Sequence, residues 1–163
     1  MKKIICIKIL LMTLGAVAQM SSNVIPKNDF FNIQINDVSF RKLVDANGDL
    51  NSLNGLLKKQ NLKSDVIIDE KYFHYTYDGF NICYSEDEIS SFVITNKNWS
   101  ITVKDKSVKI GSDWSELGNV TLNNRTDGGK SVVFQYCDGC NNYLAFELDG
   151  NGKIKKIYYI EMT

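Results

Sequence analysis

Apolar and polar residues alternate along much of the chain beyond residue 65, which is the pattern of strands that bury one face. Two such runs, Tyr72–Tyr77 and 80–84, are separated only by Asp78-Gly79. An Asp-Gly pair between alternating runs predicts a two-residue hairpin, because both central positions of that turn need positive φ. Counting back from this turn pairs His74 with Cys83. Strand patterns also cover residues 31–35, 66–68, 89–94, 99–110, 120–122, 131–136, 143–148 and 154–160.

Helical spacing of apolar residues occurs at two places. Leucines at positions 50, 53, 56 and 57 predict a helix over residues 49–59, with Asp49 or Ser52 as its N-cap and lysines near its C-terminal end. Gly55 weakens this helix by about 1 kcal/mol relative to alanine. Residues 112–117 form a second, shorter helical pattern. We therefore expect an α+β protein with a predominantly antiparallel sheet and two short helices on one face.

The predicted elements recur in the same order along the two halves of the chain. Residues 71–80 parallel residues 131–140, which places two Asp-Gly turns 60 residues apart. The helical patterns at 52–57 and 112–117 share that offset. This order predicts two degenerate repeats, each a helix followed by antiparallel strands. In the last strand of each repeat, Ile89, Phe92 and Ile94 correspond to Ile154, Ile157 and Tyr159.

The first residues carry the pattern of an export signal. Two lysines precede a mostly apolar run over residues 4–18, which ends in Ala-Val-Ala. This order predicts a secretory signal peptide over residues 1–18, cleaved near Ala18. The alternative, a membrane anchor, needs about 20 uninterrupted apolar residues, whereas this shorter run contains a lysine. We therefore expect a secreted or periplasmic protein with a flexible leader over residues 19–29 and no transmembrane segment in the mature chain.

Composition narrows the choice of partners. The full chain has 163 residues, with 19 basic and 19 acidic side chains. Cleavage removes three lysines and no acids, so the mature chain has 16 basic and 19 acidic side chains. This balance argues against a nucleic-acid partner, because phosphate contacts require a basic stripe. With 44% hydrophobic residues, the chain has enough apolar surface to bury a core.

The repeats predict one α+β domain over residues 30–163, with repeat boundaries at about 45–97 and 105–163. A helix followed by antiparallel strands, twice, in a small exported protein resembles the beta-lactamase inhibitor protein fold over residues 45–160. A single such unit also resembles the small outer-membrane assembly lipoproteins, although this chain lacks their lipid-attachment motif. The resemblance is one of pattern, and it implies a rigid sheet that binds another protein rather than a catalyst.

Three cysteines remain once cleavage removes Cys6. Cys137 and Cys140 flank the second Asp-Gly pair, where facing strand residues lie close enough for a disulfide. We therefore expect a Cys137–Cys140 disulfide that closes the hairpin. A redox role is the weaker alternative. Thioredoxin-type pairs lie at a helix N-terminus, which lowers the thiol pKa, whereas this pair lies on a predicted hairpin turn. A second alternative is a Cys₃His zinc site made of His74, Cys83, Cys137 and Cys140.

Catalytic patterns are sparse in this sequence. It has one histidine and lacks a Gly-x-Ser-x-Gly elbow, a phosphate-binding loop and a His-Glu-x-x-His motif. Residues 45–49 resemble the start of a calcium loop, but Leu50 and Leu56 occupy the positions that require glycine and glutamate. The acidic run at 86–88 is typical of a solvated turn. We therefore expect no enzymatic activity and no cofactor.

Alternation along the first hairpin separates two faces. It directs Phe73 and Tyr75 to one face, and Tyr72 and His74 to the other. Exposed tyrosine and histidine on a sheet suit a protein-binding surface, because tyrosine and tryptophan supply much of the energy of interfaces. The leading hypothesis is an exported, non-enzymatic binding or inhibitor module that contacts another extracytoplasmic protein. The alternatives are a small envelope metal-binding protein or enzyme that uses His74 and the cysteines, and a structural cell-surface component. The predicted contact surface consists of Tyr72, His74, Trp99 and Trp114.

Overall fold

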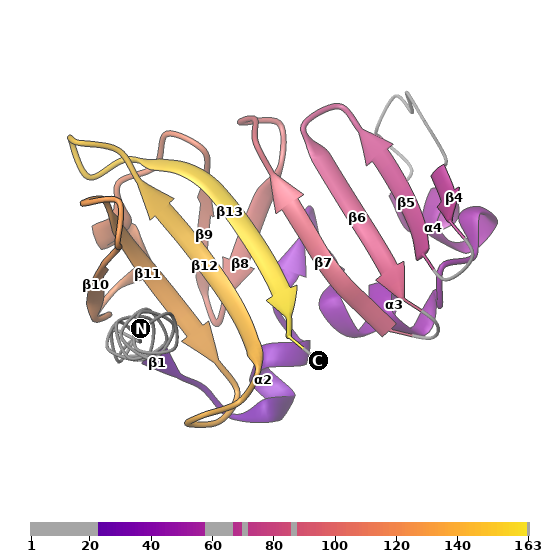
Figure 1. Ribbon diagram of the computed structural model, residues 1–163, viewed down its shortest axis with the longest axis horizontal. Coiled ribbons are helices and arrows are strands. Elements are labelled where there is room, and N and C mark those ends of the chain that lie inside the picture. The colour runs from indigo at the N-terminus through magenta and orange to yellow at the C-terminus, as the bar shows by residue number, and fades with distance from the viewer. Residues whose placement is uncertain (1–22, 58–66, 70–71, 86–87, 163) are drawn as a thin grey trace, which may run out of the picture.

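The computed structural model describes residues 23–57, 67–69, 72–85 and 88–162. The predicted signal peptide and its cleavage site lie outside these residues. Figure 1 shows a broad sheet at the front, with α3, α4 and a smaller sheet behind it. The structure is thus α+β with mainly antiparallel sheets, as the alternating pattern predicts.

Within the described ranges, the large sheet has nine strands in the order β1-β11-β12-β13-β7-β6-β5-β4, with β10 also paired to β11. Its pairings are antiparallel except for β1, which runs parallel to β11. The strands are β1 (Asn23–Val24), β4 (Ile67–Asp69), β5 (Tyr72–Tyr77), β6 (Phe80–Ser85), β7 (Glu88–Ile94), β10 (Leu122–Asn124), β11 (Lys130–Gln135), β12 (Asn142–Leu148) and β13 (Ile154–Glu161).

The small sheet packs behind the large one, and short helices connect the strands. Its order is β3-β2-β8-β9 within the described residues. Its strands are β2 (Gln34–Ile35), β3 (Val38–Ser39), β8 (Ser100–Val103) and β9 (Lys106–Lys109). The helices are α2 (Lys27–Phe31), α3 (Phe40–Asp45), α4 (Leu50–Leu56) and the 3-10 helix η1 (Trp114–Leu117).

Aromatic side chains fill the core between the two layers. Phe40 of α3 lies 4.9 Å from Tyr159 and 5.9 Å from Phe92, measured between ring centroids. Trp99, just before β8, lies 4.6 Å from Phe80. These rings come from both halves of the large sheet and from the layer behind it. Burial of large aromatic rings dominates the stabilisation of such a core, and one cluster of buried residues underlies both halves of the large sheet.

Helix caps and tyrosine hydroxyls fix the helices on the sheet. The carboxylate of Asp49 accepts a hydrogen bond from the Ser52 backbone N–H at 2.7 Å, which confirms Asp49 as the N-cap of α4. The hydroxyl of Tyr84 donates to the Leu43 carbonyl at 2.6 Å, and that of Tyr75 donates to the Gly48 carbonyl. The connection between α3 and α4 is therefore fastened to β5 and β6.

The first hairpin has the predicted register. Tyr77 pairs with Phe80 across Asp78-Gly79, and His74 pairs with Cys83. Phe73 is half-buried and Tyr75 is buried, whereas Tyr72 and His74 are exposed, so the predicted division into two faces is confirmed. Hairpin register follows from turn length, and the Asp-Gly signal specified that length.

The N-terminal segment differs from the expected flexible leader. Asn23–Val24 pairs with β11, α2 follows at Lys27–Phe31, and Ile25 is only 1% exposed. The leader prediction overlooked Ile25, whose burial in the core, together with that of Phe30 at the start of the predicted domain, holds this segment in place. The strand predicted over 31–35 is likewise shorter, since Phe31 ends α2 and only Gln34–Ile35 is extended.

Two further elements differ from the predicted ones. Residues 40–45 form α3, for which the sequence yielded no prediction; Ser39 caps it by accepting a hydrogen bond from the Lys42 N–H at 3.4 Å. The described residues therefore contain three α-helices and a 3-10 helix rather than two helices. The run expected over 99–110 is divided into β8 and β9 by a turn in which Lys104 has a φ of +57°.

Candidate binding surface

The face of the large sheet that points away from the helices, here called the outer face, is assembled by strand register. One row of directly paired positions crosses six strands and another crosses five. Because side chains alternate along a strand, paired positions lie on the same face. The first row is Thr76, Asn81, Val93, Tyr158, Ala145 and Val133, and the second is His74, Cys83, Ser91, Ile160 and Tyr143.

Exposed apolar side chains are concentrated on the outer face. Among the described residues, the large hydrophobic side chains left exposed are Val24 (52%), Tyr72 (41%), Ile160 (40%) and Met162 (48%). Strand alternation assigns three of them to this face: Tyr72 lies two positions before His74, Val24 pairs with Gln135 and Ile160 pairs with Ser91, whereas Met162 directly follows the end of β13. Figure 1 shows α3, α4 and the small sheet on the opposite side. The outer face thus presents apolar side chains from both ends of the sheet.

The charged groups around Glu147 on the outer face are paired with one another or with an aromatic ring. Arg125 pairs with Glu147 and, at 3.0 Å, with Asp127. The Lys156 ammonium lies 5.2 Å from the centroid of the Tyr158 ring, a cation–π distance. Burial raises the pKa of Tyr158, and the Glu147 carboxylate adds to the rise. Tyr158 is therefore neutral, and its ring remains an amphipathic contact surface.

His74 and Cys83 lie side by side on the outer face. The Cys83 Sγ is 3.7 Å from the His74 Nε2, and Cys83 is a free thiol that is 8% exposed. The Tyr72 ring lies 6.2 Å from the His74 ring. The structure thus brings together Tyr72 and His74 of the predicted surface, with Cys83 next to them.

The two tryptophans lie elsewhere, which corrects the predicted surface. Trp99 is 0% exposed and belongs to the core, where its indole N–H donates to the Asp78 carbonyl at 2.7 Å. Trp114 lies on η1 and is half-buried against Gly152. Neither residue is on a strand of the large sheet, so the alternation that places Tyr72 and His74 does not apply to them.

The residues that sequence reasoning missed are Val93, Tyr143, Tyr158 and Ile160. Each lies on a correctly predicted strand, and alternation alone assigns them to the face opposite the core. That these residues share one face with Tyr72 and His74 follows only from the pairing of β7 with β13. That contact joins strands more than 60 positions apart, and no local pattern encodes it.

Cys137 and Cys140 form a disulfide, with their Cα atoms 5.4 Å apart. The predicted two-residue hairpin is wrong here, because β11 ends at Gln135 and β12 begins at Asn142. Both cysteines lie in the connection, where the Gln135 side-chain amide donates to the Cys140 carbonyl at 2.6 Å. A longer turn still brings the two Cα atoms within the range of a disulfide.

This geometry excludes the alternative of a zinc site made of His74, Cys83, Cys137 and Cys140. Cys137 and Cys140 bind each other, and β7 and β13 lie between the strand of Cys83 and β12. Three strand spacings of about 4.8 Å place the two pairs roughly 14 Å apart, whereas zinc–ligand bonds are only about 2.0–2.3 Å. Over the described part of the chain, no group of three or more His, Cys, Asp and Glu side chains is arranged to hold a metal ion.

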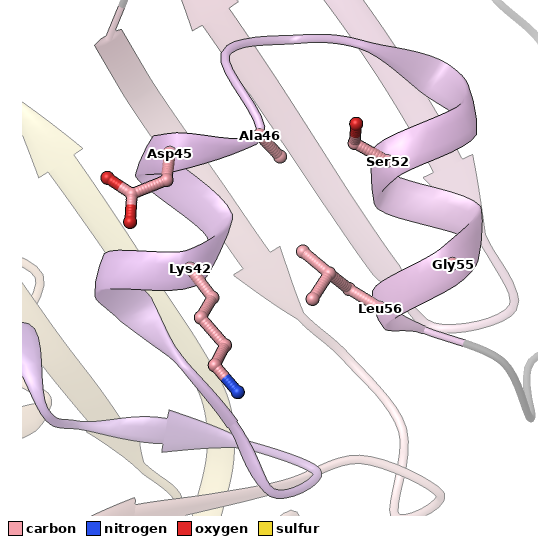
Figure 2. Close-up of a pocket in the computed structure, with 6 residues that line it drawn as sticks. All are labelled: Lys42, Asp45, Ala46, Ser52, Gly55 and Leu56. Carbon is pink, nitrogen blue, oxygen red and sulfur yellow. The ribbon is translucent and has the colours of Figure 1, made fainter.

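A shallow cleft lies between α3 and α4 (Figure 2). The side chains of Lys42 and Leu56 extend into the space between the helices, whereas the Asp45 carboxylate points away from it. Among the lining residues, Lys42 thus has no acid directed toward it. The cleft offers no acid–base pair and remains a surface depression.

No helix in the described ranges is long and apolar enough to cross a membrane. No protein-family model, curated protein or solved structure matches the chain. The resemblance to the beta-lactamase inhibitor protein fold therefore stays a prediction.

Proposed function

We propose that this protein is an exported, non-enzymatic binding or inhibitor module, and that its outer face contacts another extracytoplasmic protein. The observation that carries the proposal is the placement on one face of Val24, Tyr72 and Ile160, three of the exposed large hydrophobic side chains of the described residues. An apolar surface with paired charges and tyrosines is characteristic of the centre of a protein interface. The packed core behind the sheet holds this surface rigid, which lowers the entropic cost of binding.

Export is supported by two independent features. Residues 1–18 have the order of charges and apolar residues of a signal peptide. The Cys137–Cys140 disulfide is favoured in an oxidising compartment and is rare in reducing ones. The partner would therefore be a protein of the periplasm, the cell surface or the surrounding medium.

We also propose that the domain arose by duplication. The strands β4–β7 and β10–β13 are two antiparallel meanders in the same order, joined through β7 and β13. Each meander has a register shift next to its last hairpin turn, between Cys83 and Tyr84 in one and between Glu147 and Leu148 in the other. The extra residues, Ser90 and Lys155, are offset by the same 65 positions as Ile89 and Ile154. Such bulges are features that related units retain.

The binding proposal is tested by site-specific photocrosslinking in the organism that makes the protein. A photoreactive phenylalanine analogue replaces Tyr72 or Ile160 on the outer face, or Ser107 on β9 as the matched exposed control. We expect a discrete crosslinked protein from the two outer-face positions and none from position 107. Adding Ile160→Glu to the Tyr72 probe removes the product, because it buries a charge in the contact, whereas Lys109→Glu leaves it.

Equal crosslinking from all three positions would show that the outer face has no special role. Turnover of a substrate by the purified protein, with no crosslinked partner, would reject a non-enzymatic module. Circular dichroism of each variant establishes that it folds, so a missing product reports on the surface and not on the fold.

The His74–Cys83 contact supports a second candidate function, a small envelope enzyme with Cys83 as its nucleophile. An imidazole beside a thiol at 3.7 Å is the arrangement of a cysteine nucleophile and its base. Alkylation of the folded protein by iodoacetamide tests this function. Activation by His74 predicts at least tenfold slower alkylation in His74→Gln at pH 7. Equal alkylation rates for the two proteins would eliminate this candidate.

A further inference from the structure

A further cleft, of about 390 Å³, lies where the two sheets and the N-terminal strand meet. Residues 23–25, 103–106 and 117–120 line it, together with Phe134 of β11. Its size is within the range of small-molecule sites, about 300–1,000 Å³, and such sites favour junctions between structural layers.

The base of the cleft is apolar and its walls are fixed. Ile25, Val103 and Phe134 are each no more than 3% exposed. The Asn23 side chain joins β1 to the loop before β10: its Oδ1 accepts from the Thr121 N–H at 2.7 Å, and its Nδ2 donates to the Val133 carbonyl at 2.9 Å. The space is therefore preformed, and binding of a ligand would cost little entropy for ordering the walls of the cleft.

The rim of the cleft carries an excess positive charge. Lys104 and Asp105 form the β8–β9 turn and Lys106 begins β9; the Lys106 ammonium pairs with Asp105 at 3.2 Å. The Lys106 side chain extends toward the opposite wall, since its Cε lies 4.0 Å from where a Cβ on Gly118 would be. The two lysines and one aspartate leave one positive charge for a ligand to neutralise.

Lys104 adopts a conformation that its side chain disfavours. Its φ of +57° is in the left-handed region, which glycine or asparagine normally occupies in a two-residue hairpin turn. A lysine at this position costs folding energy and places a cationic residue on the rim. Strain of this kind is concentrated at binding sites.

We propose that this cleft binds a small molecule with an apolar body and a single carboxylate, such as a medium-chain fatty acid. The apolar body contacts the base formed by Ile25, Val103 and Phe134, and the carboxylate lies at the rim beside Lys104. This site adjoins the outer face at Val24, but Ile25, Val103, Phe134 and Lys104, which would hold the ligand, are not among the residues that carry the proposed binding function.

The test uses the mature, disulfide-bonded protein with octanoate as the probe and octanol as the uncharged control. Backbone amide shifts in NMR spectra locate the site, and calorimetry measures affinity. We expect octanoate to shift residues 103–106 and 117–120 with a Kd of about 0.1–1 mM, and octanol to bind at least threefold more weakly. Lys104→Gln should weaken octanoate about three- to fivefold, while Lys109→Gln on the same hairpin leaves it unchanged.

Steric blocking provides an independent readout. Asn119 lies on an exposed wall of the cleft, and Asn124 is an exposed position outside it. Asn119→Trp should abolish the octanoate shifts at residues 103–106, and Asn124→Trp should not. Octanol binding as tightly as octanoate, shifts confined to other surfaces, or no shift at 5 mM octanoate, on the order of five times the weakest expected Kd, would each overturn the proposal.

Discussion

The indole N–H of Trp99 donates a hydrogen bond to the backbone carbonyl of Asp78 at 2.7 Å, which joins the small sheet to the first hairpin of the large one. The Asn96 side-chain amide donates to the same carbonyl at 3.1 Å. The Asp78-Gly79 turn, which the sequence marks as a simple hairpin connection, is therefore also where the two layers are fastened together.

Replacing Trp99 should separate these layers at a large cost. Trp99→Phe removes the donor and part of a fully buried ring, so we expect a loss of about 2–4 kcal/mol in the free energy of unfolding. Urea denaturation measures it. Trp114→Phe is the matched control, since that ring is half-buried on η1 and should cost less than about 1.5 kcal/mol. Equal losses would show that Trp99 is not a core anchor.

Two glycines should respond to alanine with opposite signs. Gly79 has a φ of +77°, and an added Cβ would collide with the Asn96 side chain, so Gly79→Ala should destabilise the fold by about 1–3 kcal/mol. Gly55 lies in α4 with nothing within 4 Å of an added Cβ, so Gly55→Ala should stabilise it by about 0.5–1 kcal/mol. Thermal unfolding of both variants checks the signs, and the same sign for both would contradict this explanation.

Local signals in the sequence predicted the strands well and their long-range partners poorly. The register that pairs His74 with Cys83 followed from the Asp78-Gly79 turn, because turn length alone determines which residues face each other. The burial of Trp99 depends on contacts with Phe80 and Tyr77 from other strands, and no local pattern encodes those contacts. Only the pairing of β7 with β13 reveals that Ile160 belongs to the same face as His74.

The hydroxyl of Tyr84 should contribute measurably to stability. It donates to the Leu43 carbonyl at 2.6 Å, and the ring is 0% exposed. Tyr84→Phe leaves that buried carbonyl without this donor, so we expect a loss of about 1–2 kcal/mol by urea denaturation. Tyr72→Phe is the control on an exposed tyrosine and should change stability by less than about 0.5 kcal/mol. An unchanged midpoint for Tyr84→Phe would mean that water replaces the lost donor.

Alkaline pH should destabilise the protein through its buried tyrosines. Burial raises the pKa of Tyr77 to about 12, and the nearby Tyr75 adds to the rise, compared with about 10 in an unfolded chain. Because the folded state favours the protonated phenol, this stabilisation is complete below pH 10 and is lost as pH rises toward 12. Circular dichroism recorded between pH 9 and pH 12 follows the unfolding, with absorbance at 295 nm reporting tyrosine ionisation.

Tyr77→Phe provides the control for that pH dependence. The Tyr77 hydroxyl is buried without a hydrogen-bond partner among the described residues, so its removal should cost little at pH 7. The variant should unfold at a higher pH than the native protein, although Tyr84 and Tyr159, whose pKa values are also raised by burial, retain part of the effect. If Tyr77→Phe and the native protein unfold at the same alkaline pH, groups other than Tyr77 cause the loss of stability.

The cysteines give a prediction that separates the disulfide from the free thiol. Cys83 is only 8% exposed, so the folded mature chain should react slowly with Ellman's reagent. Unfolding in guanidinium without reductant should release one thiol per chain, and three after reduction, because Cys137 and Cys140 are bonded to each other. The disulfide closes a very short loop, so the Cys137→Ser/Cys140→Ser double variant should lose no more than about 2 kcal/mol. Three thiols on unfolding without reductant would show that the pair is reduced and that this support for export fails.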